Sequence, residues 1–507
     1  MRLSPSLRSA VAVAAVAATA LPLTSVARAD SARSDSARSD SAGAAAKRPK
    51  SLVIGVDGAT FAAFGSARMP NLAALRTGGT TATSNLYASP MAPTLSGPGW
   101  STIATGVWPD KHKVVDNSFL GADFARYPDY ATRLETAKPE RNSLVVGTWG
   151  PISGTVFGPA VDTRIAGSDD ADTTAKAVDK LASTDADATF VHLDEVDGAG
   201  HGHGTASQEY RDALEAADGR IGRILRAVTS RATYADEDWQ IIVTADHGHT
   251  AGGGHGGSSP AERQTFVIAK GTGFAPGSVR HDVKISDVAP TVLAHLGVPA
   301  DPAWKLDGKA IGALTPDAFD TLRPSLRTRV DETGLPATLK GWTHTAPSGW
   351  SVDNTAMPGG GVSEWRGWSF ANDEFWSNSQ LGQGRETNVR ARDVFAVADS
   401  DEWDDKAHGA GPFDSTLNSP AFPVTGGRAA TVSYATDYRV DGPQTGDVYI
   451  AFDGGARTLL KSYRSQLNTV EKLSVAVPAG ATSARLYFRY TGTNSAFWTV
   501  DQVTVTG

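Results

Sequence analysis

From residue 51 onward, short apolar runs alternate with longer stretches in which apolar residues recur every three or four positions. The apolar runs predict buried strands at 51–56, 143–148, 189–193, 240–244 and 265–269. The periodic stretches predict helices at 70–76, 172–183, 208–229 and 286–296. Strands that alternate with helices in this way indicate an α/β fold, with a mostly parallel sheet flanked by helices.

The pattern changes near residue 341, where tryptophan, glycine, asparagine and aspartate become frequent. Short β-type runs follow at 430–434, 447–452, 483–490 and 497–505. We therefore predict an α/β domain at 50–312, a linker at 313–340, and a C-terminal all-β sandwich domain, jelly-roll-like, at 341–507.

The N-terminus has the pattern of an export signal. A basic segment at 1–8 precedes an alanine-rich apolar run at 10–23, and Ala27-Arg28-Ala29 offers small residues for cleavage. That run is short for a membrane span, which needs about 20 apolar residues, and no later stretch is apolar enough. We expect a signal peptide at 1–29, a low-complexity linker at 30–49, a secreted protein, and no transmembrane segment in the mature chain.

Composition narrows the chemistry. The net charge of −8 gives no basic surface for nucleic-acid backbone, so no stable nucleic-acid binding is expected. The chain has no cysteine, which excludes disulfides, thiolate metal sites and cysteine nucleophiles. A transition-metal site would therefore consist of histidine and carboxylate ligands.

Three predicted strands lead into aspartates, namely Asp57, Asp197 and Asp246. The carboxyl ends of parallel strands lie at one edge of a sheet, so these carboxylates are expected to gather there. Grouped carboxylates repel one another unless a cation neutralises them. Histidines follow in the chain at His201, His247 and His255, and imidazole with carboxylate suits zinc or a similar divalent ion. Taken singly, such an aspartate is more often a helix cap and such a histidine more often structural.

Several motifs occur in a defined order. They are Gly-Val-Asp-Gly, Pro-Thr-Leu-Ser-Gly-Pro-Gly-Trp-Ser-Thr-Ile-Ala-Thr-Gly-Val-Trp-Pro-Asp-Lys-His-Lys-Val-Val-Asp-Asn, Asp-Gly-Ala-Gly-His and Thr-Ala-Asp-His-Gly. The ordered set resembles the alkaline phosphatase superfamily, and within it the nucleotide pyrophosphatase/phosphodiesterase branch, over about residues 50–312.

The resemblance implies an alkaline-phosphatase-like sheet and two divalent metal ions of the zinc type. By position in the motifs, Asp57, Asp246 and His247 would hold one ion. The other would be held by Asp197, His201 and His255.

The family's nucleophile falls on Ser96, whose hydroxyl the first ion would contact and activate. Ser96 precedes a predicted helix at 97–104, so its alternative role is a helix N-cap; Thr94 is the second choice as nucleophile. Asn117 matches an amide that donates to a phosphoryl oxygen, and an uncharged donor suits a singly charged diester. Its alternative role is a turn asparagine.

These assignments imply a metal-dependent phosphodiesterase or nucleotide pyrophosphatase that acts through a covalent serine intermediate on a small phosphate-ester or nucleotide-type substrate. A phosphomonoesterase or phosphonate hydrolase on the same scaffold is the first alternative. A sulfatase is less favoured, because Ser96-Gly97-Pro98 begins like the formylglycine motif but Trp100 stands where that motif has arginine. A degenerate extracellular binding protein is the last alternative.

Two features of the C-terminal domain allow further contacts. Its tryptophans could stack on a glycan or cell surface, or fill the sandwich core, which we favour; they are Trp350, Trp365, Trp368, Trp376 and Trp403. The acidic residues at 401–405 could bind calcium or lie on a solvated loop. Near the metal motifs, His203 and His249 are candidates for outer hydrogen-bond partners of the ligands.

Overall fold

A computed structural model describes residues 46–85 and 91–507. The predicted signal peptide and most of the predicted linker at 30–49 lie outside these residues. Residues Lys47–Gly507 form one compact unit. No helix in the described part of the chain has the length and apolar character needed to cross a bilayer.

The N-terminal part of this unit is built on an eight-stranded sheet in the order β4-β3-β5-β1-β6-β7-β2-β8. Its strands are β1 (Arg48–Val56), β2 (Thr80–Asn85), β3 (Ser143–Gly147), β4 (Thr163–Ala166), β5 (Ala188–Leu193), β6 (Glu237–Thr244), β7 (Gln264–Lys270) and β8 (Ser278–Arg280). The five strands from β4 to β6 in this order are parallel, and β7 is antiparallel to both of its neighbours. The mostly parallel sheet is confirmed, and β1 begins three residues earlier than the apolar run predicts.

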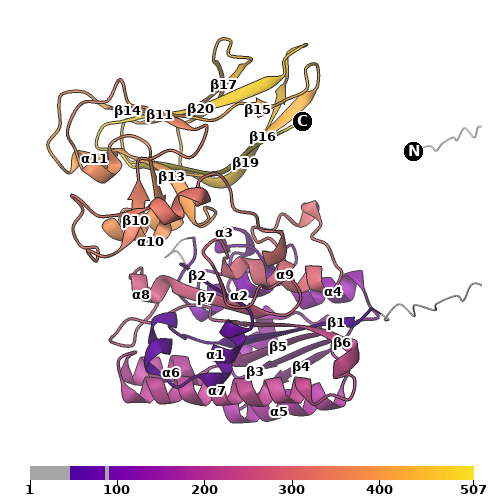
Figure 1. The fold of residues 1–507 in the computed structure, drawn as a ribbon. Coiled ribbons are helices and arrows are strands. Elements are labelled where there is room, and N and C mark those ends of the chain that lie inside the picture. Colours follow the sequence, from indigo (N-terminus) through magenta and orange to yellow (C-terminus); the bar gives the residue numbers. More distant parts are fainter. Residues whose placement is uncertain (1–45, 86–90) are drawn as a thin grey trace, which may run out of the picture. The chain divides into compact units, whose positions relative to one another are not determined.

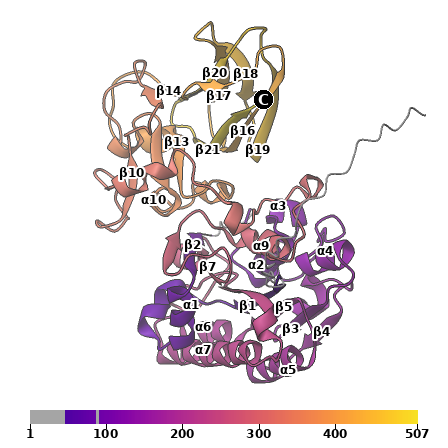
Figure 2. The same cartoon turned by 45° about the vertical axis from the view of Figure 1, so that its right-hand side comes forward.

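Helices cover both faces of this sheet (Figures 1 and 2). They are α1 (Pro70–Thr77), α2 (Ser96–Thr105), α3 (Pro109–His112), α4 (Tyr130–Ala137), α5 (Asp170–Ser183), α6 (Glu195–His203), α7 (Gln208–Thr229), α8 (Pro260–Arg263) and α9 (Val288–His295). The apolar sides of α1, α5 and α7 share one core with one face of the sheet, while α2, α4 and α9 share a second core with the other face. The helix α7 has the bounds predicted from its apolar period, and the Ser207 side chain caps its N-terminus.

The C-terminal part forms two antiparallel sheets, in the orders β19-β16-β21-β13-β12-β10-β9 and β11-β14-β20-β17-β18, with β15 paired to β20. The elements are β9 (Arg327–Thr328), β10 (Lys340–Thr343), β11 (Ser351–Asp353), β12 (Ser369–Asn372), α10 (Asp373–Ser379), β13 (Val394–Asp399), α11 (Ser400–Asp404), β14 (Phe413–Asn418), β15 (Phe422–Pro423), β16 (Ala429–Tyr438), β17 (Thr445–Phe452), β18 (Thr458–Tyr463), β19 (Leu467–Ala476), β20 (Ser483–Gly492) and β21 (Phe497–Thr506). Side chains from both sheets meet in one core, which confirms the predicted sandwich.

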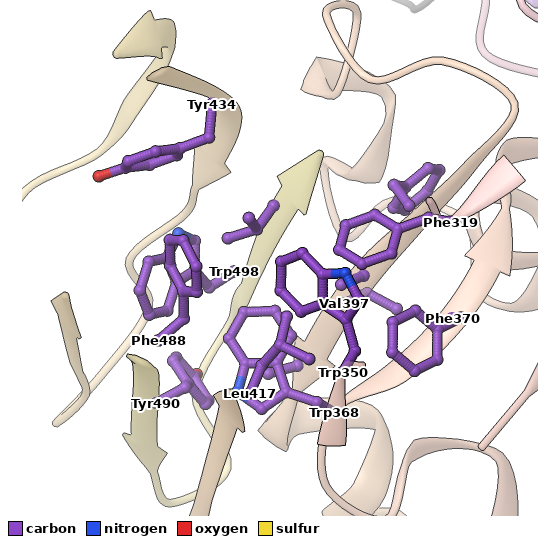
Figure 3. Close-up of a cluster of buried hydrophobic side chains, with 14 of the residues drawn as sticks. Phe319, Trp350, Trp368, Phe370, Val397, Leu417, Tyr434, Phe488, Tyr490 and Trp498 are labelled. Atoms are coloured by element: carbon purple, nitrogen blue, oxygen red, sulfur yellow. The ribbon is translucent and has the colours of Figure 1, made fainter. Parts of the chain in front are cut away.

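Aromatic side chains fill this sandwich core (Figure 3). The five tryptophans considered above as glycan platforms are all buried, with Trp368 and Trp376 at 0% exposure. Trp368 packs edge-on against Trp498 of β21, with ring centroids 5.3 Å apart. Because these rings are inside the core, they cannot present a stacking surface, and a glycan contact through them is not supported.

Candidate active site

The candidate site lies at the carboxyl edge of the parallel strands. Asp57 directly follows β1, and Asp246 comes two residues after β6, its neighbour in the sheet. Asp197 lies in the first turn of α6, just after β5 on the other side of β1. The parallel register brings the three strand ends level, so the chain delivers the carboxylates to one place as predicted.

The first group of metal-ligand type joins Asp57, Asp246 and His247, all buried. The Nε2 atom of His247 lies 3.4 Å from Asp57 Oδ1 and 3.3 Å from Asp246 Oδ2. The Ser96 hydroxyl oxygen lies 3.3 Å from the same nitrogen. Thus a carboxylate oxygen from each aspartate, an imidazole nitrogen and a serine hydroxyl converge.

This geometry fits a small divalent ion. Ligands at 2.0–2.1 Å from a tetrahedral zinc ion lie about 3.3 Å from one another. In addition, Asp57 Oδ1 and Asp246 Oδ2 are buried and accept no hydrogen bond from the described residues. Buried carboxylate oxygens are normally hydrogen-bonded, so two that point at one spot without a donor are suited to a cation.

The other atoms of this group are held in place by the protein. His247 Nδ1 lies 3.0 Å from the carbonyl oxygen of Gly248 and donates to it, which leaves Nε2 as the nitrogen that can bind an ion. Asp57 Oδ2 accepts hydrogen bonds from the indole N–H of Trp100 at 2.8 Å and from His192 Nε2 at 3.0 Å. One carboxylate oxygen is thereby fixed by donors while the other faces the ion site.

Asp57, His192 and Asp194 form a further group whose potential ligand atoms lie close together. The His192 Nδ1 atom accepts the backbone N–H of Trp149 at 3.4 Å, so Nε2 carries the ring proton. A protonated nitrogen that donates to Asp57 cannot also bind an ion. His192 therefore serves as a hydrogen-bond partner of Asp57.

The second group gathers around Asp197 on α6. His201, one helical turn later, places Nε2 3.3 Å from Asp197 Oδ2. His255 Nε2 lies 2.9 Å from His201 Nε2 and 3.5 Å from Asp197 Oδ1. The structure thus brings together all three residues that the resemblance implies for the second ion. The separations of His201 and His255 from Asp197 are those of a ligand pair, while the two imidazole nitrogens lie at hydrogen-bond distance from each other.

His255 is anchored by the segment just before Ser96. Its Nδ1 atom donates to the carbonyl oxygen of Thr94 at 2.8 Å, which leaves Nε2 free to bind an ion. The Thr94 hydroxyl donates to the Gly257 carbonyl oxygen at 2.8 Å and accepts the Gly256 N–H at 2.9 Å. Three hydrogen bonds therefore hold the glycine-rich loop at 252–257 to the segment just before Ser96, and the Thr94 hydroxyl both donates and accepts.

Ser96 is the first residue of α2 and not its N-cap, which is Leu95. The N-cap alternative for Ser96 is therefore wrong. Ser96 is buried, with 7% of the residue exposed, and its hydroxyl contacts His247 of the first ligand group. This is the position that a metal-activated nucleophile requires.

Asn117 lies beside the N-terminus of α2. Its Oδ1 atom accepts the N–H of Gly97 at 2.7 Å, so the amide NH₂ is the half that remains for another partner. The side chain is thus oriented next to Ser96 instead of serving only its own turn. One N–H at the helix start is used by this bond and is not available to a phosphate.

Burial and mutual repulsion dominate the electrostatics of the first group. Burial, reinforced by the charge of Asp197, raises the pKa of Asp57 to about 8. Burial and the charge of Asp57 raise the pKa of Asp246 well above its usual range. Burial and the neighbouring His255 lower the pKa of His247 to about 3, so that ring is neutral. The first group therefore disfavours anionic carboxylates and keeps its imidazole neutral, which suits completion by a cation. In contrast, against the effect of burial, the hydrogen bond from His249 lowers the pKa of Asp197.

Sequence reasoning missed the contributions of Trp100 and His192. Trp100 is four residues after Ser96, so both side chains lie on the same face of α2. His192 is the one polar residue in the otherwise apolar run at the end of β5. The helical spacing and the strand-end position are signals that could have pointed to both residues. The calcium alternative for residues 401–405 gains nothing, because none of the three groups of metal-ligand type in the described residues includes them.

Comparison with known proteins agrees with the motifs. The profile of the family described as type I phosphodiesterase / nucleotide pyrophosphatase matches residues 51–164 and 144–256. The family resemblance is confirmed. This phosphodiesterase-like segment contains every site residue named above, including Ser96, Asn117 and His255.

Among curated proteins, the chain is similar to GPI ethanolamine phosphate transferase 1 of Candida glabrata, with 36% identity over 101 residues. It is also similar to the Mus musculus protein of that name, with 30% identity over 131 residues. The matches cover 20% and 22% of this chain but only 11% and 14% of those relatives.

Solved structures resemble it more distantly. Murine ectonucleotide pyrophosphatase / phosphodiesterase 5 has a TM-score of 0.40 at 14% identity, covering 50% of this chain and 96% of that one. The phosphonate monoester hydrolase of Agrobacterium radiobacter has a TM-score of 0.41 at 17% identity, covering 53% and 78%. Similarities this distant add nothing to the assignment.

Proposed function

We propose that the protein is a secreted phosphodiesterase that depends on two divalent ions of the zinc type and uses Ser96 as its nucleophile. The observation that carries the proposal is the position of the Ser96 hydroxyl, 3.3 Å from Nε2 of His247, which groups with Asp57 and Asp246. The family of the matched segment supports chemistry on phosphoester bonds.

In this proposal Asp57, Asp246 and His247 hold one ion, and Asp197, His201 and His255 hold the other. When bound, the ions would supply positive charge that lowers the pKa of a hydroxyl and offsets the charge that develops on phosphoryl and leaving oxygens. The ligand atoms of Asp57, Asp246 and His247 lie within 4.8 Å of one another, and Nε2 of His201 lies 3.3 Å from Asp197 Oδ2.

The protein's own groups then perform the substitution. Ser96 Oγ loses its proton and forms a bond to phosphorus while the bond to the leaving alcohol breaks, and the leaving oxygen gains a proton. The Asn117 NH₂ donates to a non-bridging oxygen, because its Oδ1 is already committed to Gly97. Attack by water on the phosphoryl-serine releases the product and regenerates the hydroxyl.

An uncharged amide in the phosphate-binding position favours a singly charged diester over a doubly charged monoester, for which a cationic fork would be stronger. Turnover of bis(4-nitrophenyl) phosphate and of 4-nitrophenyl phosphate separates these alternatives, since both release the same alcohol. The proposal predicts the higher kcat/KM for the diester, and a higher value for the monoester would contradict the diester assignment.

Ser96→Ala tests the nucleophile. We expect diester turnover to fall by at least about 10⁴-fold, as when other enzymes lose a nucleophile, while metal content is retained by the remaining ligands. Ser101→Ala is a matched control, because Ser101 is buried on the same helix and its hydroxyl has no hydrogen-bond partner among the described residues. A Ser96→Ala protein as active as Ser101→Ala would sink the nucleophile assignment.

A second candidate is a transferase, favoured by the similarity to GPI ethanolamine phosphate transferases. In that case an alcohol, not water, would take the phosphoryl group from Ser96. Phosphorus NMR of products formed from a diester in the presence and absence of ethanolamine or glycerol distinguishes the two. A phosphorylated acceptor as the main product would favour the transferase, and inorganic or monoester phosphate alone would favour the hydrolase.

Export is supported by the sequence of residues 1–29. Mass spectrometry of protein collected from the medium of expressing cells should find a mature N-terminus at Asp30. Retention of the full chain inside the cells would argue against it.

A further inference from the structure

His249 is a fully buried imidazole two residues after His247, and the sequence offers it only as a candidate outer hydrogen-bond partner, without saying of which ligand. We infer that His249 is a positioning residue, which donates a hydrogen bond to Asp197 and so holds that carboxylate in place for the second ion. This inference rests on the proposed two-ion site and deepens it.

The distance between the two side chains is that of a hydrogen bond. His249 Nε2 lies 2.6 Å from Asp197 Oδ1. Two ligands of one zinc-type ion would be about 3.3 Å apart, as His201 Nε2 and Asp197 Oδ2 are at 3.3 Å. His249 forms a group of metal-ligand type with Asp197, His247 and His255, but its separation from Asp197 is too short for a pair of ligands on one ion.

The ring proton is placed by the surroundings of His249. The Nδ1 atom is buried and has no hydrogen-bond partner among the described residues. An imidazole N–H points to where an acceptor is available, which here is at Nε2, facing Asp197. Nε2 is therefore a donor, and a nitrogen that donates a proton cannot bind a metal ion at the same time.

The space for this ring is made by two glycines from different elements. A Cβ atom on Gly58, just after β1, would lie 2.6 Å from His249 Nε2, and one on Gly200 of α6 would lie 2.8 Å from it. Any side chain at either position would push the ring away from Asp197. Two distant parts of the chain thus leave room for the imidazole at the point where it meets the carboxylate.

The first ion site has the same arrangement. There His192 donates from Nε2 to Asp57 Oδ2 at 3.0 Å. In contrast, His247 and His255 both donate from Nδ1 to backbone carbonyl oxygens and present Nε2 to the ion sites. These four imidazoles therefore divide into two that would bind ions and two that orient carboxylates.

Two substitutions separate a donor from a ligand. His249→Gln keeps an N–H donor near the position of Nε2, whereas His249→Leu fills the space without a donor. The metal-stripped proteins are titrated with Co²⁺, and the visible absorption spectrum and a competing chelator report the affinity of each site. His203→Leu, at the exposed end of α6, is the matched control.

We expect His249→Leu to bind the second Co²⁺ about 10- to 100-fold more weakly, with the first site unchanged. His249→Gln and His203→Leu should bind both ions within about threefold of the wild type, because both variants keep an N–H donor beside Asp197 and so avoid the loss of 10-fold or more. Circular dichroism of each variant reports whether it is folded.

Two results would overturn the inference. Unchanged second-site affinity in folded His249→Leu would show that the donor is not needed, and equal losses in His249→Gln and His249→Leu would identify a ligand instead. A wild-type protein that binds fewer than two Co²⁺ ions would refute the two-ion site itself, and with it this role. The wild-type titration therefore tells a failure of the proposed function from a failure of the role of His249.

Discussion

Thr94→Val removes the hydroxyl that holds the glycine-rich loop to the segment just before Ser96. The Gly256 N–H and the Gly257 carbonyl oxygen would lose their partner. The hydrogen bond from the His255 ring to the backbone carbonyl oxygen of residue 94 remains possible. Each hydrogen bond contributes about 0.5–1.5 kcal/mol. Both glycines are exposed, so water can replace part of this, and about 2 kcal/mol is expected in total.

This loss falls on the loop that carries His255, so it should appear in the affinity for the second ion. At 1.4 kcal/mol per tenfold, about 2 kcal/mol corresponds to roughly 30-fold weaker binding. Zinc titration of metal-stripped protein against a chelator of known affinity measures it. Thr94→Ser keeps the hydroxyl and should bind both ions nearly as tightly as the wild type.

Wild-type affinity for both ions in Thr94→Val would show that the Thr94 hydroxyl does not hold the glycine-rich loop in place. If Thr94→Val kept both ions but lost diester turnover while Thr94→Ser did not, Thr94 would be the nucleophile in place of Ser96.

Two predictions concern stability. Burial lowers the pKa of His112 to about 3 from 6.5, so between these values the unfolded state binds a proton that the folded state does not, and the free energy of unfolding falls as the pH drops through this window. The loss of unfolding free energy should reach roughly 3 kcal/mol at about pH 4.5. Denaturant titrations should show this loss in the wild type but not in His112→Asn. Equal pH dependence of the unfolding free energy in both proteins would contradict the prediction. On α6, Gly202→Ala has open space around it and should stabilise the protein by about 1 kcal/mol. Gly200→Ala would place its Cβ 2.8 Å from His249 Nε2 and should lower the melting temperature instead, so equal stabilisation by both would contradict the packing described here.

Much of the fold could be predicted because its elements have strong periodic patterns. The helix α7 has its predicted bounds, and β1, β5 and β6 are buried on both faces and read as continuous apolar runs. The antiparallel direction of β7 could not be predicted, because an apolar run carries no information about strand direction. Short polar strands such as β9 (Arg327–Thr328) and β11 were missed, since they depend on pairing with their neighbours.

The candidate site divides in the same way. Asp57, Asp197 and Asp246 could be grouped from the sequence because each follows a strand of one parallel sheet. The hydrogen bond from Trp100 to Asp57 joins residues 43 positions apart, and the two residue types alone do not predict it. The role of His249 depends on which ring nitrogen carries the proton and on the room left by distant glycines, and a sequence states neither.

The number of divalent ions that each chain retains tests the central claim most directly. Purified protein is loaded with zinc, freed of excess metal, and analysed by inductively coupled plasma mass spectrometry alongside diester turnover. We predict two ions for the wild type and one for His255→Ala, because this substitution removes a ligand of the second site only. A wild-type protein that holds no ion and still turns over diesters at its full rate after exhaustive chelation would contradict the account.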